Sequence, residues 1–208
     1  FRSAIIGGSV FRIGVGATPF LLPLMFQIAF GLTPFESGLI TFIGALGAMT
    51  SKFAAERMFA RFGFPRVLAL TSIAACLSLA VIGLFGPETP HVWLYAILLA
   101  MGLLRSMFFT GVNALAFADI SENDASQAAA ISTVSQQLAV AFGVAVAGGA
   151  LELSSNMNGG ELGLADFHFA WFVVAGVSLI SALWFVRLPP DAGADVSGHK
   201  GKPVETSV

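Results

Sequence analysis

Two arginines lie well inside long apolar stretches of this sequence, Arg12 and Arg105. An arginine at the centre of a membrane-spanning helix costs about 2.5–3.5 kcal/mol on insertion scales, so such a residue usually faces a counter-charge or a water-filled cavity. The chemistry on offer is the binding of a negative charge, supplied by another part of the protein or by an anionic substrate. The alternative is that the long side chain extends to the membrane interface. That alternative suits Arg12, near the start of its stretch, better than Arg105, near the middle of its own.

The first apolar stretch carries further special residues on the face of Arg12. At about 100° per residue, a sector of roughly 80° contains Arg12, Gly16, Pro19, Pro23 and Gln27. Because proline has no N–H group, the carbonyl groups four residues before Pro19 and Pro23 lose their helical donors, and a kink is expected there. A stripe of arginine, free carbonyls and an amide is typical of a helix that lines a hydrated path. A purely structural kink explains the prolines but not the polar residues beside them.

Two later stretches also place polar side chains on one helical face. The fourth stretch has Ser106, Thr110 and Asn113 beside its arginine, and the fifth has Ser132 and Gln136 one turn apart. Polar side chains in membrane helices also join helices by hydrogen bonds, which is the alternative interpretation. The predicted cavity-lining residues are Arg12, Gln27, Arg105, Asn113 and Gln136, and the predicted helix kink lies at Pro19 and Pro23.

Signatures of catalysis are missing from the sequence. It contains no HExxH, no GxSxG and no Walker loop, and its three histidines fall in expected connections or in the tail. The Asp and Glu residues fall at expected helix ends, between helices or in the tail. No basic run long enough for nucleic acid is present. We therefore expect neither an enzyme nor a metal site nor a nucleic-acid partner.

The elements that must position these residues are membrane helices. Of 208 residues, 56% are apolar and only 11% are charged. A bilayer core needs about 20 apolar helical residues to cross it, and the backbone in lipid must satisfy its own hydrogen bonds. The fold class predicted is an all-α integral membrane bundle over residues 1–187, followed by a disordered cytoplasmic tail over 188–208. The six expected helices cover residues 4–30, 34–58, 65–85, 92–118, 123–151 and 167–186.

The distribution of Lys and Arg sets the expected orientation. Basic residues lie at both ends of the chain and around the second connection, whereas the first, third and fifth connections have none. Cytoplasmic loops carry the excess of Lys and Arg, so both ends are predicted to be cytoplasmic. The chain opens on Phe1 in what reads as the end of a loop, which indicates a fragment that lacks its N-terminal part.

Six helices with cytoplasmic ends and a basic second connection resemble one half of a major facilitator superfamily transporter. The segment FRIGVGATPFLLPLMFQIAFGLTPFESGLI resembles the opening of the C-terminal half in the drug:proton antiporter group with 14 spans, the EmrB/QacA type. GALGAMTSKFAAERMFARFGFPRVL resembles that group's basic loop, and NALAFADISENDASQAAAISTVSQQLAVAFGVAVAGG resembles its later helix pair. The resemblance covers about residues 1–187.

The resemblance implies two six-helix bundles around a central cavity that opens alternately to each side of a bacterial inner membrane. It implies proton-coupled efflux of drugs or small hydrophobic compounds, with the N-terminal bundle as partner. No cofactor is implied beyond the proton, whose carboxylate is expected in the missing half. The family's cytoplasmic gate motif is matched by Gly47, Arg61, Gly63 and Arg66, but Ala60 stands at the motif's Asp position. Whether the whole protein has 12 or 14 spans stays open.

Two alternatives also stay open. The same fold could carry an anionic metabolite, with the two membrane arginines as ligands. A true six-helix membrane protein could instead act as a scaffold or a dimerising partner. Transport of an organic acid would favour the first, and a native polypeptide near 21.6 kDa without substrate flux would favour the second.

Overall fold

A computed structural model describes residues 2–117, 120 and 124–186, and its regular structure is entirely helical. The expected all-α membrane fold is thereby confirmed; the expected tail after residue 187 lies outside the described residues. Five helical segments are long and apolar enough to cross a membrane, or six if the bent α3 is one span. In chain order the helices are α1 (Arg2–Gly16), α2 (Thr18–Ile28), α3 (Pro34–Phe62), α4 (Phe64–Ile82), α5 (His91–Phe117), α6 (Ala125–Met157) and α7 (Leu164–Val186).

The first span is interrupted between α1 and α2. Ala17 forms a turn there, and its N–H group donates to the carbonyl of Gly14 at 3.2 Å, three residues back rather than four. Pro19 is the second residue of α2, where its missing N–H group is tolerated, and Pro23 lies inside the helix. The sequence expectation was one continuous helix over residues 4–30, and Ala4–Ile28 indeed counts as one candidate span, with a single turn residue at Ala17.

Local signals explain how α3 begins and ends. The hydroxyl of Thr33 accepts the N–H group of Glu36, whose carboxylate accepts the N–H group of Thr33 at 2.9 Å, and Pro34 is the first helical residue. Gly63 ends the helix with φ +76°, a backbone conformation that residues with a Cβ rarely adopt. The helix runs to Phe62, past the expected end at residue 58. It bends by 55° between Pro34–Ser51 and Ala55–Phe62.

Helix α6 also extends further than the sequence predicted. It continues to Met157, beyond the expected end at residue 151. Ser154 and Ser155 are buried, so the packed face of α6 continues through polar residues beyond residue 151. The N–H group of Asn158 closes the helix on the carbonyls of these two serines.

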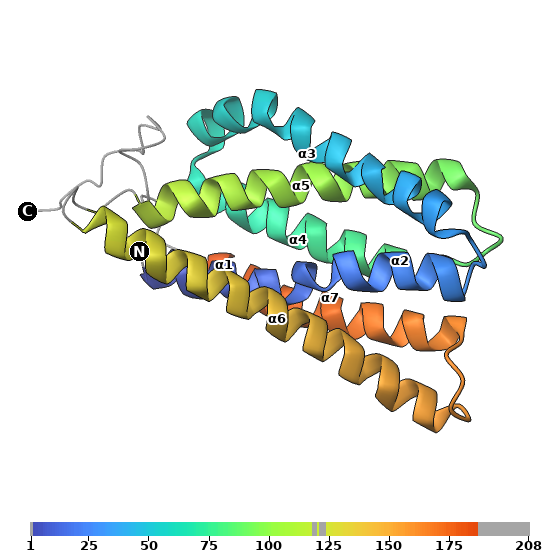
Figure 1. Ribbon diagram of the computed structural model, residues 1–208. Helices are drawn as coiled ribbons and strands as arrows, with labels where there is room; N and C mark the ends of the chain where they lie inside the picture. Colours follow the sequence, from blue (N-terminus) through green and yellow to red (C-terminus); the bar gives the residue numbers. More distant parts are fainter. Residues whose placement is uncertain (1, 118–119, 121–123, 187–208) are drawn as a thin grey trace, which may run out of the picture.

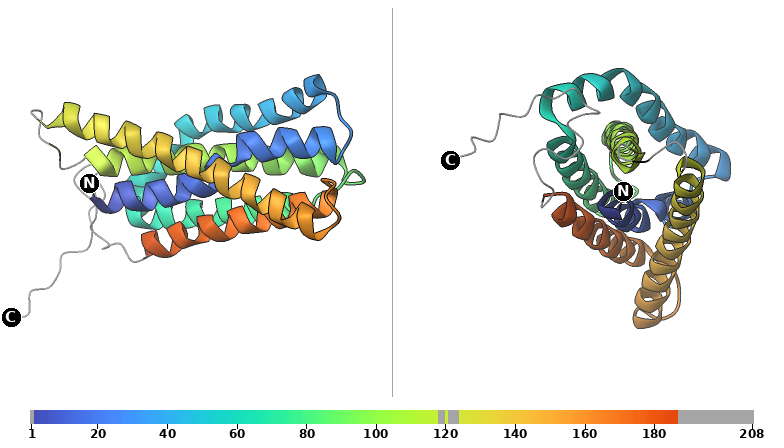
Figure 2. Two further views of the ribbon diagram at one scale, coloured as in Figure 1. Left: turned by 60° about the horizontal axis from the view of Figure 1, so that its bottom comes forward. Right: turned by 90° about the vertical axis from the view of Figure 1, so that its left-hand side faces the viewer.

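Close helix crossings hold the bundle together. Figure 2 shows α5 near the centre, with α3 and α4 beside it, and α1 packs against α5, α6 and α7. The crossings use glycine: a Cβ on Gly102 of α5 would strike the carbonyl of Gly44 on α3, and a Cβ on Gly143 of α6 would strike that of Ile13 on α1. Small residues let membrane helices approach closely, and dispersion between the backbones then stabilises the pair.

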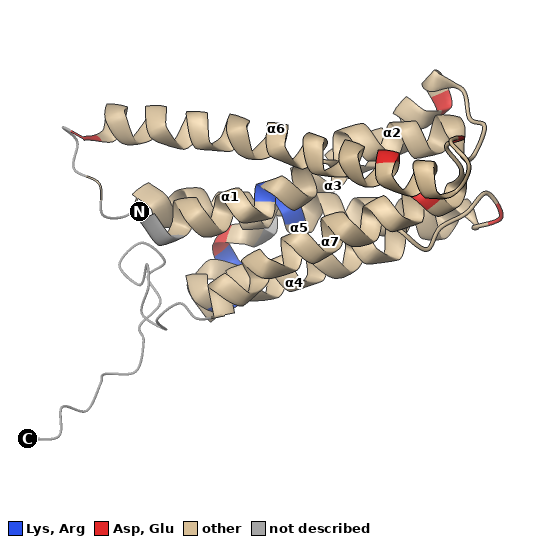
Figure 3. Cartoon of the chain, turned by 90° about the horizontal axis from the view of Figure 1, so that it is seen from below, with Lys and Arg blue, Asp and Glu red and all other residues tan. Residues whose placement is uncertain are grey.

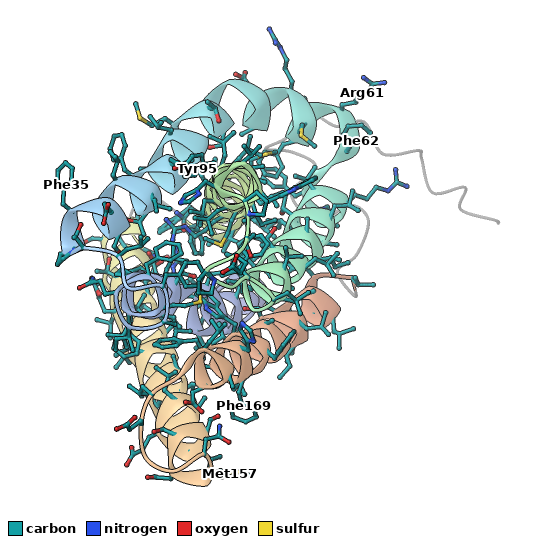
Figure 4. The ribbon with its side chains drawn as sticks, turned by 90° about the vertical axis from the view of Figure 1, so that its right-hand side faces the viewer. Phe35, Arg61, Phe62, Tyr95, Met157 and Phe169 are labelled. Carbon is teal, nitrogen blue, oxygen red and sulfur yellow. The ribbon has the colours of Figure 1, made fainter. Side chains whose placement is uncertain are left out.

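Large apolar side chains form outward-facing stripes. On α3 the exposed stripe consists of Phe35, Leu39, Phe42, Leu46 and Met49. Phe35 is 79% exposed, and Figure 4 shows both Phe35 and Phe169 of α7 pointing away from the bundle. Stripes of this extent at helical spacing are incompatible with a water-facing surface and fit contact with lipid or another apolar bundle.

The two ends of the bundle differ in charge. The chain reverses at one end between α2 and α3, α4 and α5, and α6 and α7, and these connections contain no Lys or Arg (Figure 1). Acidic segments gather at the same end in Figure 3. The opposite end carries the start of α1 and the basic junction of α3 and α4. The two basic parts of the chain therefore lie at the same end of the bundle, as the distribution of Lys and Arg predicted.

A buried carboxylate fastens the hairpin of α6 and α7. One oxygen of Asp166 accepts hydrogen bonds from the Ser154 hydroxyl at 2.5 Å and the Asn158 amide at 2.7 Å. The other oxygen accepts the N–H group of Gly163 at 2.9 Å, which caps α7. Hydrogen bonds to a charged carboxylate are stronger than hydrogen bonds between neutral groups.

We expect the substitution Asp166→Ala to lower the free energy of unfolding by about 2 kcal/mol, because the buried Ser154 hydroxyl then loses its acceptor. Thermal melting of the purified complete gene product measures the effect. Glu161→Ala is the matched control, since it removes an exposed acid from the same connection. Equal melting temperatures for both variants would contradict a fastening role for Asp166.

Candidate functional site

A cavity of about 220 Å³ lies between α2, α3 and α5. Its walls are mainly apolar, and one charged side chain reaches it. The lining residues are Thr18, Pro19, Leu22, Pro23, Thr41, Gly44, Leu98, Met101, Gly102 and Arg105. Pockets for whole drug-sized ligands are about 300–1,000 Å³, so this cavity suits a small ligand or one end of a larger one.

Arg105 supplies the charge of the cavity. It lies within α5, four residues before Phe109, and its side chain is half-buried. Among the described residues, none forms an ion pair or a hydrogen bond with its guanidinium group. None of the lining residues is Asp or Glu. The cavity therefore presents an uncompensated positive charge with several N–H donors.

Two hydroxyl groups share the cavity with this arginine. Thr18 is only 4% exposed, and its oxygen has no hydrogen-bond partner within the described part of the chain. A buried polar atom without a partner is uncommon and calls for an explanation such as a ligand or water. The hydroxyl of Thr41 donates to the carbonyl of Gly38 at 2.9 Å, which leaves its oxygen lone pairs as acceptors.

Arg12 is engaged elsewhere. Its guanidinium carbon lies 4.2 Å from the centre of the Phe109 ring, a cation–π contact that joins α1 to α5. It does not line the cavity. The contact nonetheless places a second positive charge against α5 one turn beyond Arg105, and Figure 3 shows basic segments between the ends of the bundle.

The other predicted cavity residues do not meet at this site. Gln27 and Asn113 are exposed, and Gln136 is half-buried with its amide donating to the Ser132 hydroxyl at 2.8 Å within α6. Arg12 lies on α1, before the turn at Ala17, and the two prolines lie on α2 beyond it. Of the predicted set, the structure brings together Arg105 and the kink residues Pro19 and Pro23.

The predicted gate residues fall in two places. Gly63 forms the junction of α3 and α4, with Arg61 and Arg66 exposed on either side. The guanidinium carbon of Arg61 lies 5.4 Å from the ring centre of Phe62, its neighbour in Figure 4. Gly47 lies apart from them in the crossing of α3 and α5, where a Cβ would strike the carbonyl of Leu99. The close packing of α3 against α5 is therefore sufficient reason for a glycine at position 47.

Sequence reasoning missed most of the cavity wall. Thr18 directly precedes a predicted kink residue, so the proline motif was the available signal for it. Gly44 and Gly102 mark the crossing that brings α3 to Arg105, but a single glycine in a membrane helix does not reveal its partner. Apolar wall residues such as Leu22, Leu98 and Met101 are of types common throughout membrane helices, so the sequence does not distinguish them.

Comparison with known proteins places this geometry in a family. The profile described as Major Facilitator Superfamily matches residues 4–207. The protein named "Putative multidrug resistance protein MdtD" from Escherichia coli O6:H1 is 31% identical over 208 residues, which is 97% of this chain and 44% of that protein. The protein of the same name from Salmonella paratyphi B is 30% identical over 198 residues, covering 92% of this chain and 41% of that protein.

The chain thus spans less than half the length of the curated relatives it matches. The profile match covers nearly all of the helical bundle, and both relatives match along almost the whole chain. With its apolar helices and charge-poor interior, the protein belongs to the major facilitator superfamily of multi-pass membrane proteins.

Proposed function

We propose that this chain forms the C-terminal bundle of a bacterial inner-membrane transporter that exports drugs or other small hydrophobic compounds in exchange for protons. The single observation that supports this most is the cavity between α2, α3 and α5, apolar except for Thr18, Thr41 and Arg105. An arginine held at membrane depth is costly and is retained where a solute or a charge passes. The relatives' printed name supports efflux rather than uptake.

Alternating access would work through the breaks in the helices. The interruption at Ala17 separates α1, which packs on α6 and α7, from α2, which lines the cavity. The bend of α3 lies toward its basic end. Rocking of this bundle against a second one would open the cavity to one side of the membrane at a time.

The orientation and the coupling step belong to the same proposal. We place the basic junction at Arg61, Gly63 and Arg66 on the cytoplasmic side, as part of the gate. The acidic residues of the described chain lie toward helix ends and connections. The proton-carrying carboxylate of the transport cycle therefore lies in the partner bundle of the same protein.

Proton release from energised vesicles tests this function across several chemical classes of substrate at once. Everted membrane vesicles that contain the complete gene product are acidified inside, and a pH-sensitive dye reports loss of the gradient on addition of a cationic, a neutral and a carboxylate-bearing drug. We expect at least one class to discharge the gradient faster than in vesicles without the gene product. No discharge by any class, with abundant protein in the membrane, would contradict the proposal and favour a scaffold.

A further inference from the structure

We propose that the cavity between α2, α3 and α5 binds a carboxylate group of the transported compound, with Arg105 and Thr18 as its ligands. This inference rests on the transport function proposed above and names the chemical class of its substrate. It goes beyond a general hydrophobic cargo, because it assigns a negative charge to one end of the molecule.

The charge balance of the site supports an anion. The guanidinium group of Arg105 has no anionic partner among the described residues, and no acidic side chain lines the cavity. Arg12 stands against Phe109, one turn further along α5, so a second positive charge adds to the local potential. A cationic compound would be repelled here, whereas a carboxylate would neutralise the half-buried charge of Arg105 and accept hydrogen bonds from its N–H groups.

The unpartnered hydroxyl of Thr18 is an independent observation that points the same way. This residue lines the cavity, is 4% exposed and has no hydrogen bond from its oxygen to any described residue. The hydroxyl oxygen is covered in this structure, so a turn about χ1 is needed to bring it to the cavity, where it can donate one hydrogen bond to a carboxylate oxygen that the arginine also binds. A ligand of this kind satisfies the orphaned hydroxyl and the unpaired guanidinium together.

The size and walls of the cavity define the rest of the ligand. About 220 Å³ holds a carboxylate with a small apolar group beside it, but not a whole drug-sized molecule. Leu22, Leu98 and Met101 give this group an apolar surface. The predicted substrate is therefore an amphipathic organic acid whose carboxylate end enters the cavity and whose remaining part extends from it.

Binding of a small aromatic acid and its neutral amide tests the proposal directly. The purified complete gene product is titrated with 4-fluorobenzoate or 4-fluorobenzamide, and fluorine NMR line broadening that unlabelled benzoate reverses reports specific binding. We expect the acid to bind and the amide to bind at least about tenfold more weakly. Arg105→Gln should weaken acid binding at least about tenfold, Arg105→Lys less than that, and Thr18→Val about threefold, as one hydrogen bond implies. Arg57→Gln, which makes the same charge change at an exposed position of α3, should bind as the unaltered protein does.

Several results would overturn the carboxylate site. Equal binding of the acid and the amide would do so, as would unchanged acid binding in Arg105→Gln at a normal melting temperature. Absence of acid binding in the unaltered protein would mean that an internal carboxylate or no anion occupies the site. Flux in the vesicle assay without charge-dependent binding overturns this inference alone. Charge-dependent binding without any flux leaves the carboxylate site in place and removes the transport proposal.

Discussion

Replacing Gly102 by valine is expected to prevent stable folding of the bundle. Even one added carbon at this position would strike the backbone carbonyl of Gly44, which cannot rotate away as a side chain would. The two parallel helices must then separate, and the hydrogen bond between the Ser51 and Ser106 hydroxyls, 2.6 Å long, is lost with their contact. Overpacking costs about 1–3 kcal/mol where neighbours can adjust, and a backbone-to-backbone crossing adjusts poorly.

The measurement is the amount of monodisperse protein after extraction from the membrane, together with its melting temperature. We expect Gly102→Val to lose most of the folded protein, and Gly102→Ala to melt several degrees lower than the unaltered chain. Gly176→Val and Gly176→Ala in α7 are matched controls, because a Cβ there meets no atom within 4 Å. Equal yields and melting temperatures for the two alanine variants would contradict the tight crossing of α3 and α5.

Replacing Arg105 by alanine is expected to abolish the proposed export while leaving the protein in the membrane at its usual abundance. The side chain forms no ion pair or hydrogen bond with described residues, so its removal breaks no interaction of this bundle. Removing this half-buried charge also removes its desolvation cost, so stability should not fall. The loss should therefore appear in flux alone, with a decrease of tenfold or more.

Drug-resistance growth assays and vesicle flux measure this loss, with immunoblots to confirm abundance. Arg105→Lys should retain part of the flux, since it keeps the charge but not the planar donor array. Arg57→Ala removes an exposed arginine of the same chain and should leave export unchanged. Wild-type export by Arg105→Ala would exclude this residue from the transport path.

Arg12 differs from Arg105 for a reason that was not readable in the sequence. Both are arginines in apolar stretches, and both were predicted to face a cavity. In the structure Arg12 packs over the Phe109 ring, whereas Arg105 lines a cavity and has no ion-pair or hydrogen-bond partner among the described residues. The side chain that receives a membrane arginine lies on another helix, so only helix packing decides whether the arginine is structural or available to a ligand.

The sequence by itself determined the fold class, the approximate spans and the family, because apolar length, capping residues and charge placement are properties of the chain in one dimension. It also marked Arg105, Pro19 and Pro23, whose types are unusual in membrane helices. Tertiary structure alone decided the extension of α6, the packing role of Gly47 and the membership of the cavity. These depend on which residues of different helices meet, and such contacts join segments that lie far apart in the sequence.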